Sequence, residues 1–283
     1  MTDTTEITID IDGLKLSALS AISGSKHKIL CLHGWLDNAN SFKPLLPLLN
    51  DAEIVAIDLP GHGYSDHQTS IYSLATQAHI TLEVADALGW GKFTLIGHSL
   101  GGCIAPFATA ASPERIENLI MIEAAGPRSE RPESLPDRLT EFHRDMRKAN
   151  KYKSRLFDSV DQAVESRLRV NSMSVASAKL IIDRQLLRVE RDGSVKWQWR
   201  FDGKLRIASP SYFTEKQVQA VLNSINCQTL CILADEGYLT DRPETEERLS
   251  CIKKLSRITL PGHHHLHLDN PEPVATAINN FLN

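Results

Sequence analysis

One serine stands between glycines at the end of an apolar run, a setting that suits covalent chemistry. Residues 95–102 read LIGHSLGG, so that Gly97 and Gly101 flank Ser99 at small-x-Ser-x-small spacing. Glycines lack a Cβ atom, which allows a strand and the following helix to approach closely while the serine is held at the apex of a sharp, strained turn. The positive end of that helix would lie behind the hydroxyl. The pattern predicts that Ser99 is a nucleophile.

A serine nucleophile needs a base, and the last apolar run leads into a histidine-rich loop, PGHHHLHLDNPE at 261–272. A serine hydroxyl reacts poorly at neutral pH, whereas histidine accepts a proton readily because its pKa lies near 6.5. Histidines of the loop that are not the base are expected to face solvent or to support the site, with a histidine-rich metal site as the alternative. The candidates are His263, His264, His265 and His267.

Short apolar segments alternate with amphipathic segments and must position these residues. After an opening strand pair over 7–21, the segments KILCLHG, EIVAIDLPGHG, FTLIGHS, NLIMIEAAG, TLCILADEG and RITLPGHHH each read as a strand followed by a polar loop. The alternation predicts an α/β fold with a mostly parallel sheet and helices on both faces. Ligands bind such sheets outside the carboxyl ends of the strands. Helices are expected at 41–49, 74–88, 100–111, 215–225 and 271–282.

About ninety residues without a strand–helix unit interrupt this alternation, far more than an ordinary connection needs. We expect residues 127–212 to form an inserted, mainly helical cap on a core made of 1–126 and 213–283. Within the cap, residues 135–149 and 160–187 have helical patterns.

The sequence LRVERDGSVKWQWRF, at the end of the cap, is typical of a hairpin. A three-residue loop at 191–193 would set Val189 opposite Val195 and Leu187 opposite Trp197, with the apolar residues on one face. Three aromatic residues here either line an acyl pocket or pack the cap on itself: Trp197, Trp199 and Phe201.

The charges are unevenly divided between cap and core. The net charge is −4, so the chain lacks the basic excess of a nucleic-acid-binding protein. The cap carries 19 Lys and Arg against 12 Asp and Glu, which leaves −11 on the core. Either the long helices have solvated, charged faces, or the cap attracts anionic substrates.

The composition indicates a cytoplasmic protein with reduced thiols. The first residues have neither a basic nor an apolar leader region, and no window approaches the roughly 18 apolar residues of a membrane span. Five cysteines are scattered through mostly apolar runs, which argues against a disulfide framework. Cys227 and Cys231 lack zinc-site spacing.

Four motifs, in this order along the chain, resemble those of the α/β-hydrolase superfamily. LHGWLDNANSF (32–42) is similar to its oxyanion loop, DLPGHGYS (58–65) to its next strand–loop signature, GHSLGG (97–102) to its nucleophile elbow, and PGHHHLHLDNPE to its histidine loop. Within the superfamily the chain resembles the capped serine hydrolases of the carboxylesterase and serine hydrolase-like branch. Haloalkane dehalogenases and epoxide hydrolases have Asp where this chain has Ser99.

The resemblance implies the remaining site residues. The base of the family lies seven positions before a proline that opens the last helix, which points to His264. The oxyanion would be bound by the backbone N–H groups of Leu100 and Trp35. Most members place the acid where Asp235 stands, whereas Glu123 has a setting similar to the Glu acid of some dehalogenases and of a coelenterazine-type luciferase. We select Glu123.

These residues predict a serine hydrolase that cleaves a carboxylic ester or thioester through an acyl-enzyme, without a metal or an organic cofactor. A small-molecule ester is the expected partner. A C–C bond hydrolase with the same triad and a ligand receptor on a hydrolase scaffold are the alternatives. Three histidines beside glycine turns are expected to be structural hydrogen-bonding residues: His33, His62 and His98.

Overall fold

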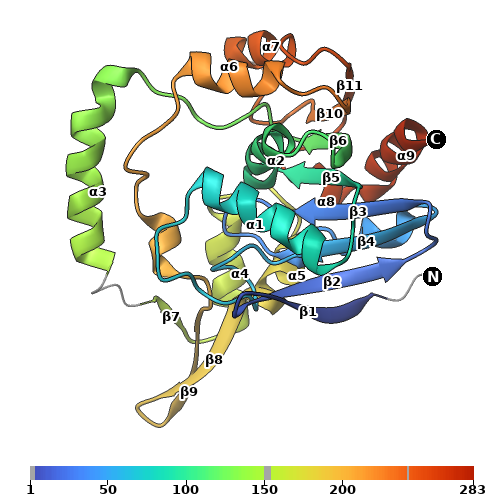
Figure 1. Ribbon diagram of the computed structural model, residues 1–283. Helices are drawn as coiled ribbons and strands as arrows, with labels where there is room; N and C mark the ends of the chain where they lie inside the picture. The colour runs from blue at the N-terminus through green and yellow to red at the C-terminus, as the bar shows by residue number, and fades with distance from the viewer. Residues whose placement is uncertain (1–3, 150–153, 241) are drawn as a thin grey trace.

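The computed structural model describes residues 4–149, 154–240 and 242–283, which form one central sheet with helices around it and a second, smaller sheet (Figure 1). The central sheet has the strand order β1-β2-β4-β3-β5-β6-β10-β11. β2 is antiparallel to both of its neighbours, and the other pairs are parallel. The predicted mostly parallel sheet is confirmed. The strands are β1 (Thr5–Ile11), β2 (Leu14–Ile22), β3 (His27–Leu32), β4 (Ala52–Ile57), β5 (Phe93–His98), β6 (Ile116–Ile122), β10 (Gln228–Ala234) and β11 (Leu255–Leu260).

Alternate residues of the central strands belong to two apolar clusters on opposite faces of the sheet. Leu30 and Leu32 of β3 belong to one cluster, and Ile29 and Cys31 belong to the other. Because both faces are covered, these strands are apolar throughout rather than alternating. The helices of the core are α1 (Leu74–Ala87), α2 (Leu100–Ala111), α6 (Glu215–Asn223), α7 (Pro243–Leu249), α8 (Leu266–Asp269) and α9 (Pro271–Leu282).

The helix predicted at 41–49 is wrong. Two short 3₁₀ turns, Ala39–Ser41 and Leu46–Leu48, occupy this part of the chain. Pro44 and Pro47 explain the difference, because a proline inside a helix removes a backbone donor and clashes with the preceding turn.

The segment between β6 and α6 has its own small core. A cluster that includes Phe157, Val164 and Ile182 is separate from the clusters on the main sheet. The limits 127 and 212 of the cap remain a prediction, and we use "cap" for this range. Its elements are α3 (Leu135–Ala149), β7 (Leu156–Phe157), α4 (Val160–Leu168), α5 (Val175–Gln185), β8 (Leu186–Arg191) and β9 (Ser194–Trp199), with 3₁₀ turns at Pro132–Ser134 and Gly203–Arg206.

The continuous helical pattern predicted over 160–187 is divided in the structure. α4 ends at Leu168, and Ser174 begins α5 by accepting a hydrogen bond from the N–H of Ser177. The chain then enters β8 at Leu186. A helix pattern that continues in phase across a loop hides the break, and the capping serine at 174 is the signal that marks it.

The hairpin exists, but its predicted register is wrong by one residue. Its turn has two residues, Asp192 and Gly193, both with positive φ, which is typical of a tight hairpin turn. Val189 therefore pairs with Lys196, and Leu187 pairs with Gln198. In Figure 1 the hairpin projects from the cap, away from the central sheet.

Candidate active site

The predicted nucleophile lies at a strained turn between β5 and α2. Ser99 has φ 50° and ψ −109°, and its N–H donates to the carbonyl of Ile122 at 3.0 Å. A Cβ atom on Gly97 would lie 2.3 Å from the carbonyl oxygen of Gly101, and one on Gly101 would lie 2.0 Å from that of Leu32. The glycines thus permit a backbone approach that no other residue allows, and Ser99 remains partly exposed at the turn.

Gly101→Ala should disrupt this turn. The new methyl group would meet the carbonyl of Leu32, a backbone atom of β3 that cannot move without distorting the sheet. We expect the free energy of unfolding to fall by about 1–3 kcal/mol, as for an overpacked core. Gly91→Ala is the matched control, because a Cβ atom there has no neighbour within 4 Å. Equal denaturation midpoints for the two variants would contradict this account of the turn.

The structure brings Glu123 and His264 together. Glu123 Oε2 lies 3.1 Å from His264 Nδ1, and both side chains are buried. Two backbone N–H groups hold the carboxylate: that of Ala234 donates to Oε1 at 2.8 Å and that of Tyr238 to Oε2 at 3.0 Å. A Cβ atom on Gly237 would lie 2.4 Å from Oε1, so the turn after β10 wraps closely around the carboxylate.

Asp235, the other candidate acid, lies in that same turn but has a different partner. Its exposed carboxylate accepts the N–H of Gly262 through Oδ1 at 2.8 Å, at the start of the histidine loop. It is Glu123 that lies within hydrogen-bond reach of His264 Nδ1. The ring of Tyr238 stacks on that of His264, with centroids 4.3 Å apart and an angle of 24° between the ring planes.

The other loop histidines have separate positions. His263 is exposed, and its Nδ1 lies 3.5 Å from Glu236. His265 Nε2 lies 3.2 Å from Asp37 Oδ2. Burial, followed by the neighbouring His265, lowers the pKa of His267 to about 3, so this ring is neutral at physiological pH.

The three histidines beside glycine turns lie in the interior and contact backbone groups. His33 Nε2 accepts the N–H of Leu59 at 2.9 Å, so its Nδ1 carries the proton and donates to the carbonyl of Gly34 at 2.8 Å. His98 Nε2 lies 2.8 Å from the carbonyl of His264 and ties β5 to the histidine loop. His62 Nδ1 lies 3.1 Å from the carbonyl of Pro60, and burial lowers the pKa of His62 to about 3.

The segment that follows β3 forms a turn against the elbow. The N–H of Asp37 donates to the carbonyl of Gly34 at 3.0 Å, and we call residues 34–37, which include the predicted oxyanion donor Trp35, the oxyanion turn. The N–H of Gly101 donates to the carbonyl of His33 at 3.0 Å, which fixes this segment against α2. Within the described residues, the N–H groups of Trp35 and Leu100 donate to no protein acceptor.

A cavity of about 690 Å³ adjoins both of these residues. It lies between the core and the end of the cap, and its lining includes Trp35 and Leu100 together with apolar side chains of both parts. The apolar members include Leu59, Leu74, Ala75, Ile207, Ala208 and Phe213.

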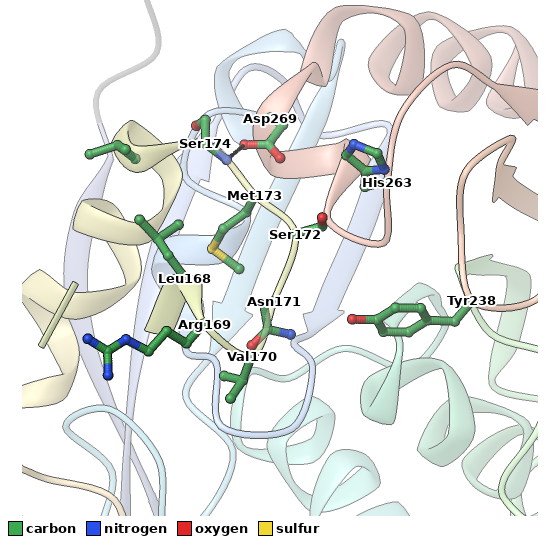
Figure 2. A pocket seen from close by; sticks show the side chains of 11 residues that line it. Leu168, Arg169, Val170, Asn171, Ser172, Met173, Ser174, Tyr238, His263 and Asp269 are labelled. Carbon is green, nitrogen blue, oxygen red and sulfur yellow. Dashed lines mark hydrogen bonds between the residues drawn. The ribbon is translucent and has the colours of Figure 1, made fainter. Parts of the chain in front are cut away.

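A second cavity, of about 660 Å³, lies on the side of the histidine loop. Figure 2 shows Tyr238, His263 and Asp269 from the core facing the loop that joins α4 to α5. The N–H of Ser174 donates to Asp269 Oδ1 at 3.0 Å across this boundary.

The cap aromatics pack on one another rather than line either cavity. Trp199 contacts Phe157 edge-on, with centroids 4.9 Å apart, and stacks on Phe201 at 5.8 Å. Trp197 packs against the same small core. Of the two interpretations of these residues, the described part of the chain favours packing of the cap on itself.

Two cap arginines are buried in ion pairs with core carboxylates. Arg184, at the end of α5, donates from Nε to Asp58 Oδ2 at 2.7 Å and also pairs with Glu6. Arg167 of α4 pairs with Asp37. Part of the basic excess of the cap is therefore used to dock it on the acidic core. Attraction of anionic substrates by the remainder stays a prediction.

Asp37, His98 and His265 offer three buried atoms within 4.8 Å of one another that could hold a metal ion. Burial would raise the pKa of the Asp37 carboxyl, but Arg167 and then His265 outweigh it and hold that pKa well below its usual range. A metal ion would compete with the Arg167 guanidinium for the same carboxylate. The arginine already supplies the compensating positive charge.

All five cysteines are free, and Cys31 and Cys231 are buried. Burial raises the pKa of Cys103, in the first turn of α2, to about 12, so its thiol is protonated at neutral pH. Among the described helices, none is long and apolar enough to cross a membrane.

Comparison with known proteins identifies the family. The model of the alpha/beta hydrolase fold matches residues 28–271. A serine hydrolase-like protein of Danio rerio is 32% identical over 276 residues, which cover 90% of this chain and 81% of the relative. The chain belongs to the α/β-hydrolase fold family, and the predicted resemblance is confirmed.

Solved structures agree with this assignment. A hypothetical protein from Pseudomonas aeruginosa PAO1 has a TM-score of 0.90 and 34% identity, with coverage of 98% of this chain and 97% of that chain. A thioesterase domain from the curacin biosynthetic pathway has a TM-score of 0.83 and 25% identity, with coverage of 98% and 99%. The fold and the relatives together make this protein a member of a hydrolase family.

Proposed function

We propose that the protein is a serine hydrolase that cleaves a carboxylic ester or thioester through an acyl-enzyme. The observation that carries the proposal is the buried pair of Glu123 and His264, at 3.1 Å, at the same end of the sheet as the strained Ser99. A carboxylate at Nδ1 holds the imidazole in the tautomer whose Nε2 accepts a proton. No metal or organic cofactor takes part in this proposal.

In the proposed reaction, Ser99 Oγ attacks the carbonyl carbon of the substrate while His264 takes the hydroxyl proton. The N–H groups of Trp35 and Leu100 bind the resulting oxyanion. The intermediate collapses as His264 gives the proton to the leaving alcohol or thiol. Water, activated by the same histidine, then attacks the acyl-enzyme and releases the acid.

The apolar residues of the cavity beside Trp35 and Leu100 support a substrate with an apolar part in its acyl group. A carbonyl oxygen held by those two N–H groups would place its acyl chain beside the apolar residues of this cavity, whose lining also includes Arg128 and Arg206. The likeness to a thioesterase domain supports thioesters as well as oxygen esters. A cytoplasmic location and a small-molecule substrate are parts of the same proposal.

A panel of p-nitrophenyl esters and acyl thioesters, together with a serine-reactive fluorophosphonate, tests the proposal. We expect turnover of apolar acyl substrates and a single phosphonate adduct on the peptide that contains Ser99. Absence of both turnover and adduct would contradict the proposal and favour a ligand-binding protein. Cleavage of a vinylogous diketone without any ester cleavage would favour the C–C bond hydrolase instead.

A further inference from the structure

The oxyanion turn contains a residue in an unfavourable backbone conformation. Leu36 is the third residue of the turn and has φ 57°, in the left-handed region that a residue with a Cβ atom rarely adopts. Trp35, whose N–H is the proposed oxyanion donor, directly precedes it. A relaxation of Leu36 to negative φ would change the geometry of the turn that carries this donor.

Two side chains of the cap hold the turn in this conformation. Arg167 Nη1 donates to the carbonyl of Leu36 at 3.0 Å, and Gln185 Nε2 donates to the same oxygen at 2.7 Å. Arg167 also pairs with Asp37, the last residue of the turn. A third contact from the cap reaches Trp35, whose Nε1 donates to the carbonyl of Leu205 at 3.0 Å.

Gln185 has a placement that packing alone does not require. The residue is 1% exposed, and it lies at the end of a helix whose other buried residues include Ala178, Ile181 and Ile182. Within the described residues Oε1 has no hydrogen-bond partner, so the hydrogen bond to Leu36 is the one that the side-chain amide makes to this part of the protein. Burying an amide with one end unsatisfied is unfavourable, and an apolar residue would pack there without that cost.

The turn is also connected to the other parts of the site. A Cβ atom on Gly34 would lie 2.7 Å from Asp37 Oδ2 and 3.0 Å from His98 Nδ1, so the turn packs directly on the residue before Ser99. Asp37 contacts His265 of the histidine loop through Oδ2. A shift of the turn would therefore occur beside the nucleophile and the base.

We infer that Arg167 and Gln185 of the cap are positioning residues, which hold the oxyanion turn in its active conformation through the carbonyl of Leu36. The inference rests on the proposed function, because it assigns these residues a role in the placement of the Trp35 N–H. The cap then does more than cover the cavity: it completes the arrangement of the oxyanion donors. A displacement of about 1 Å in such a site costs up to 100-fold in rate.

Gln185→Met tests the inference, since methionine fills a similar volume and lacks the donor. With p-nitrophenyl butyrate we expect kcat to fall about 10- to 100-fold and KM to change less than about threefold, because the oxyanion exists only in the transition state. The Ki of an aliphatic trifluoromethyl ketone, which forms a tetrahedral adduct, should rise by about the factor by which kcat/KM falls. The melting temperature should stay within about 3 °C of that of the wild type, because Leu36 keeps its bond from Arg167.

His67→Leu is the matched control. It removes another hydrogen bond between core and cap, from His67 Nε2 to the carbonyl of Arg200 at 3.1 Å, and leaves residues 34–37 untouched. We expect wild-type kcat in this variant. Arg167→Met should lower both kcat and the melting temperature because it leaves Asp37 buried without its partner.

The outcomes separate the inference from the proposed function. A wild-type protein that hydrolyses the ester, together with a Gln185→Met variant of unchanged kcat, would overturn the inference alone. A rise in KM without a fall in kcat would also overturn it. A wild-type protein with neither turnover nor a phosphonate adduct would overturn the proposed function and this inference together.

Discussion

Ser99→Ala should lower kcat/KM for p-nitrophenyl butyrate by about 10³-fold or more, because the attacking oxygen is removed. The fold should persist. The Ser99 side chain makes no capping hydrogen bond, and the backbone bond to Ile122 remains available to alanine. Activity and the melting temperature, measured on the same preparation, give the two readouts. The fluorophosphonate adduct should disappear in this variant.

Ser112→Ala, at the other end of α2, is the matched control and should retain wild-type activity and labelling. Activity of Ser99→Ala within about tenfold of the wild type would refute the assignment of the nucleophile. A phosphonate adduct that persists in Ser99→Ala would refute it too. Cys103, the neighbouring thiol, is a poor substitute nucleophile because burial raises its pKa to about 12.

The sequence predicted those elements whose local signals agree with their tertiary surroundings. The sequence predicts helices at 100–111 and 271–282, and α2 and α9 have those limits. The expected helix at 41–49 failed because two prolines outweigh an apolar pattern. The predicted register of the hairpin is wrong because two residues with positive φ make a two-residue turn in place of the expected three-residue loop. A shift of one residue exchanges the two faces of a strand.

Within the site, local motifs predict Ser99 and His264, whereas no motif predicts the contacts that Arg167 and Gln185 make. Ser99 and His264 stand in glycine- and histidine-rich loops at strand ends, which local patterns mark. Arg167 and Gln185 contact the carbonyl of Leu36 from 131 and 149 residues away along the chain. Their role depends on how the cap docks, and nothing in the residues around them signals that contact.

The sequence alone also does not decide which of the two carboxylates lies beside His264. Glu123 and Asp235 follow adjacent strands, β6 and β10, so both stand at the same edge of the sheet. The chain turns at 235–238 so that backbone N–H groups point at Glu123, while Asp235 faces the N–H of Gly262. Glu123 itself has φ 49°, a conformation that the sequence alone does not reveal.

Glu123→Gln should therefore lower kcat by about 10²- to 10⁴-fold. A glutamine has one carbonyl oxygen for the three donors that the carboxylate now meets, the N–H groups of Ala234 and Tyr238 and the ring of His264. If the amide NH₂ takes the position of Oε2, it donates to Nδ1 and leaves the proton on Nε2. That tautomer cannot accept the proton of Ser99.

Asp235→Asn is the matched control at the neighbouring strand end, and kcat should stay within about tenfold of the wild type. Its amide oxygen can still accept the N–H of Gly262, so the histidine loop keeps that support. The two variants are compared by kcat for p-nitrophenyl butyrate and by melting temperature. A large loss of kcat in Asp235→Asn together with a small one in Glu123→Gln would reverse the assignment, because it would mean that the carboxylate orienting His264 during the reaction is not the one that lies 3.1 Å from Nδ1.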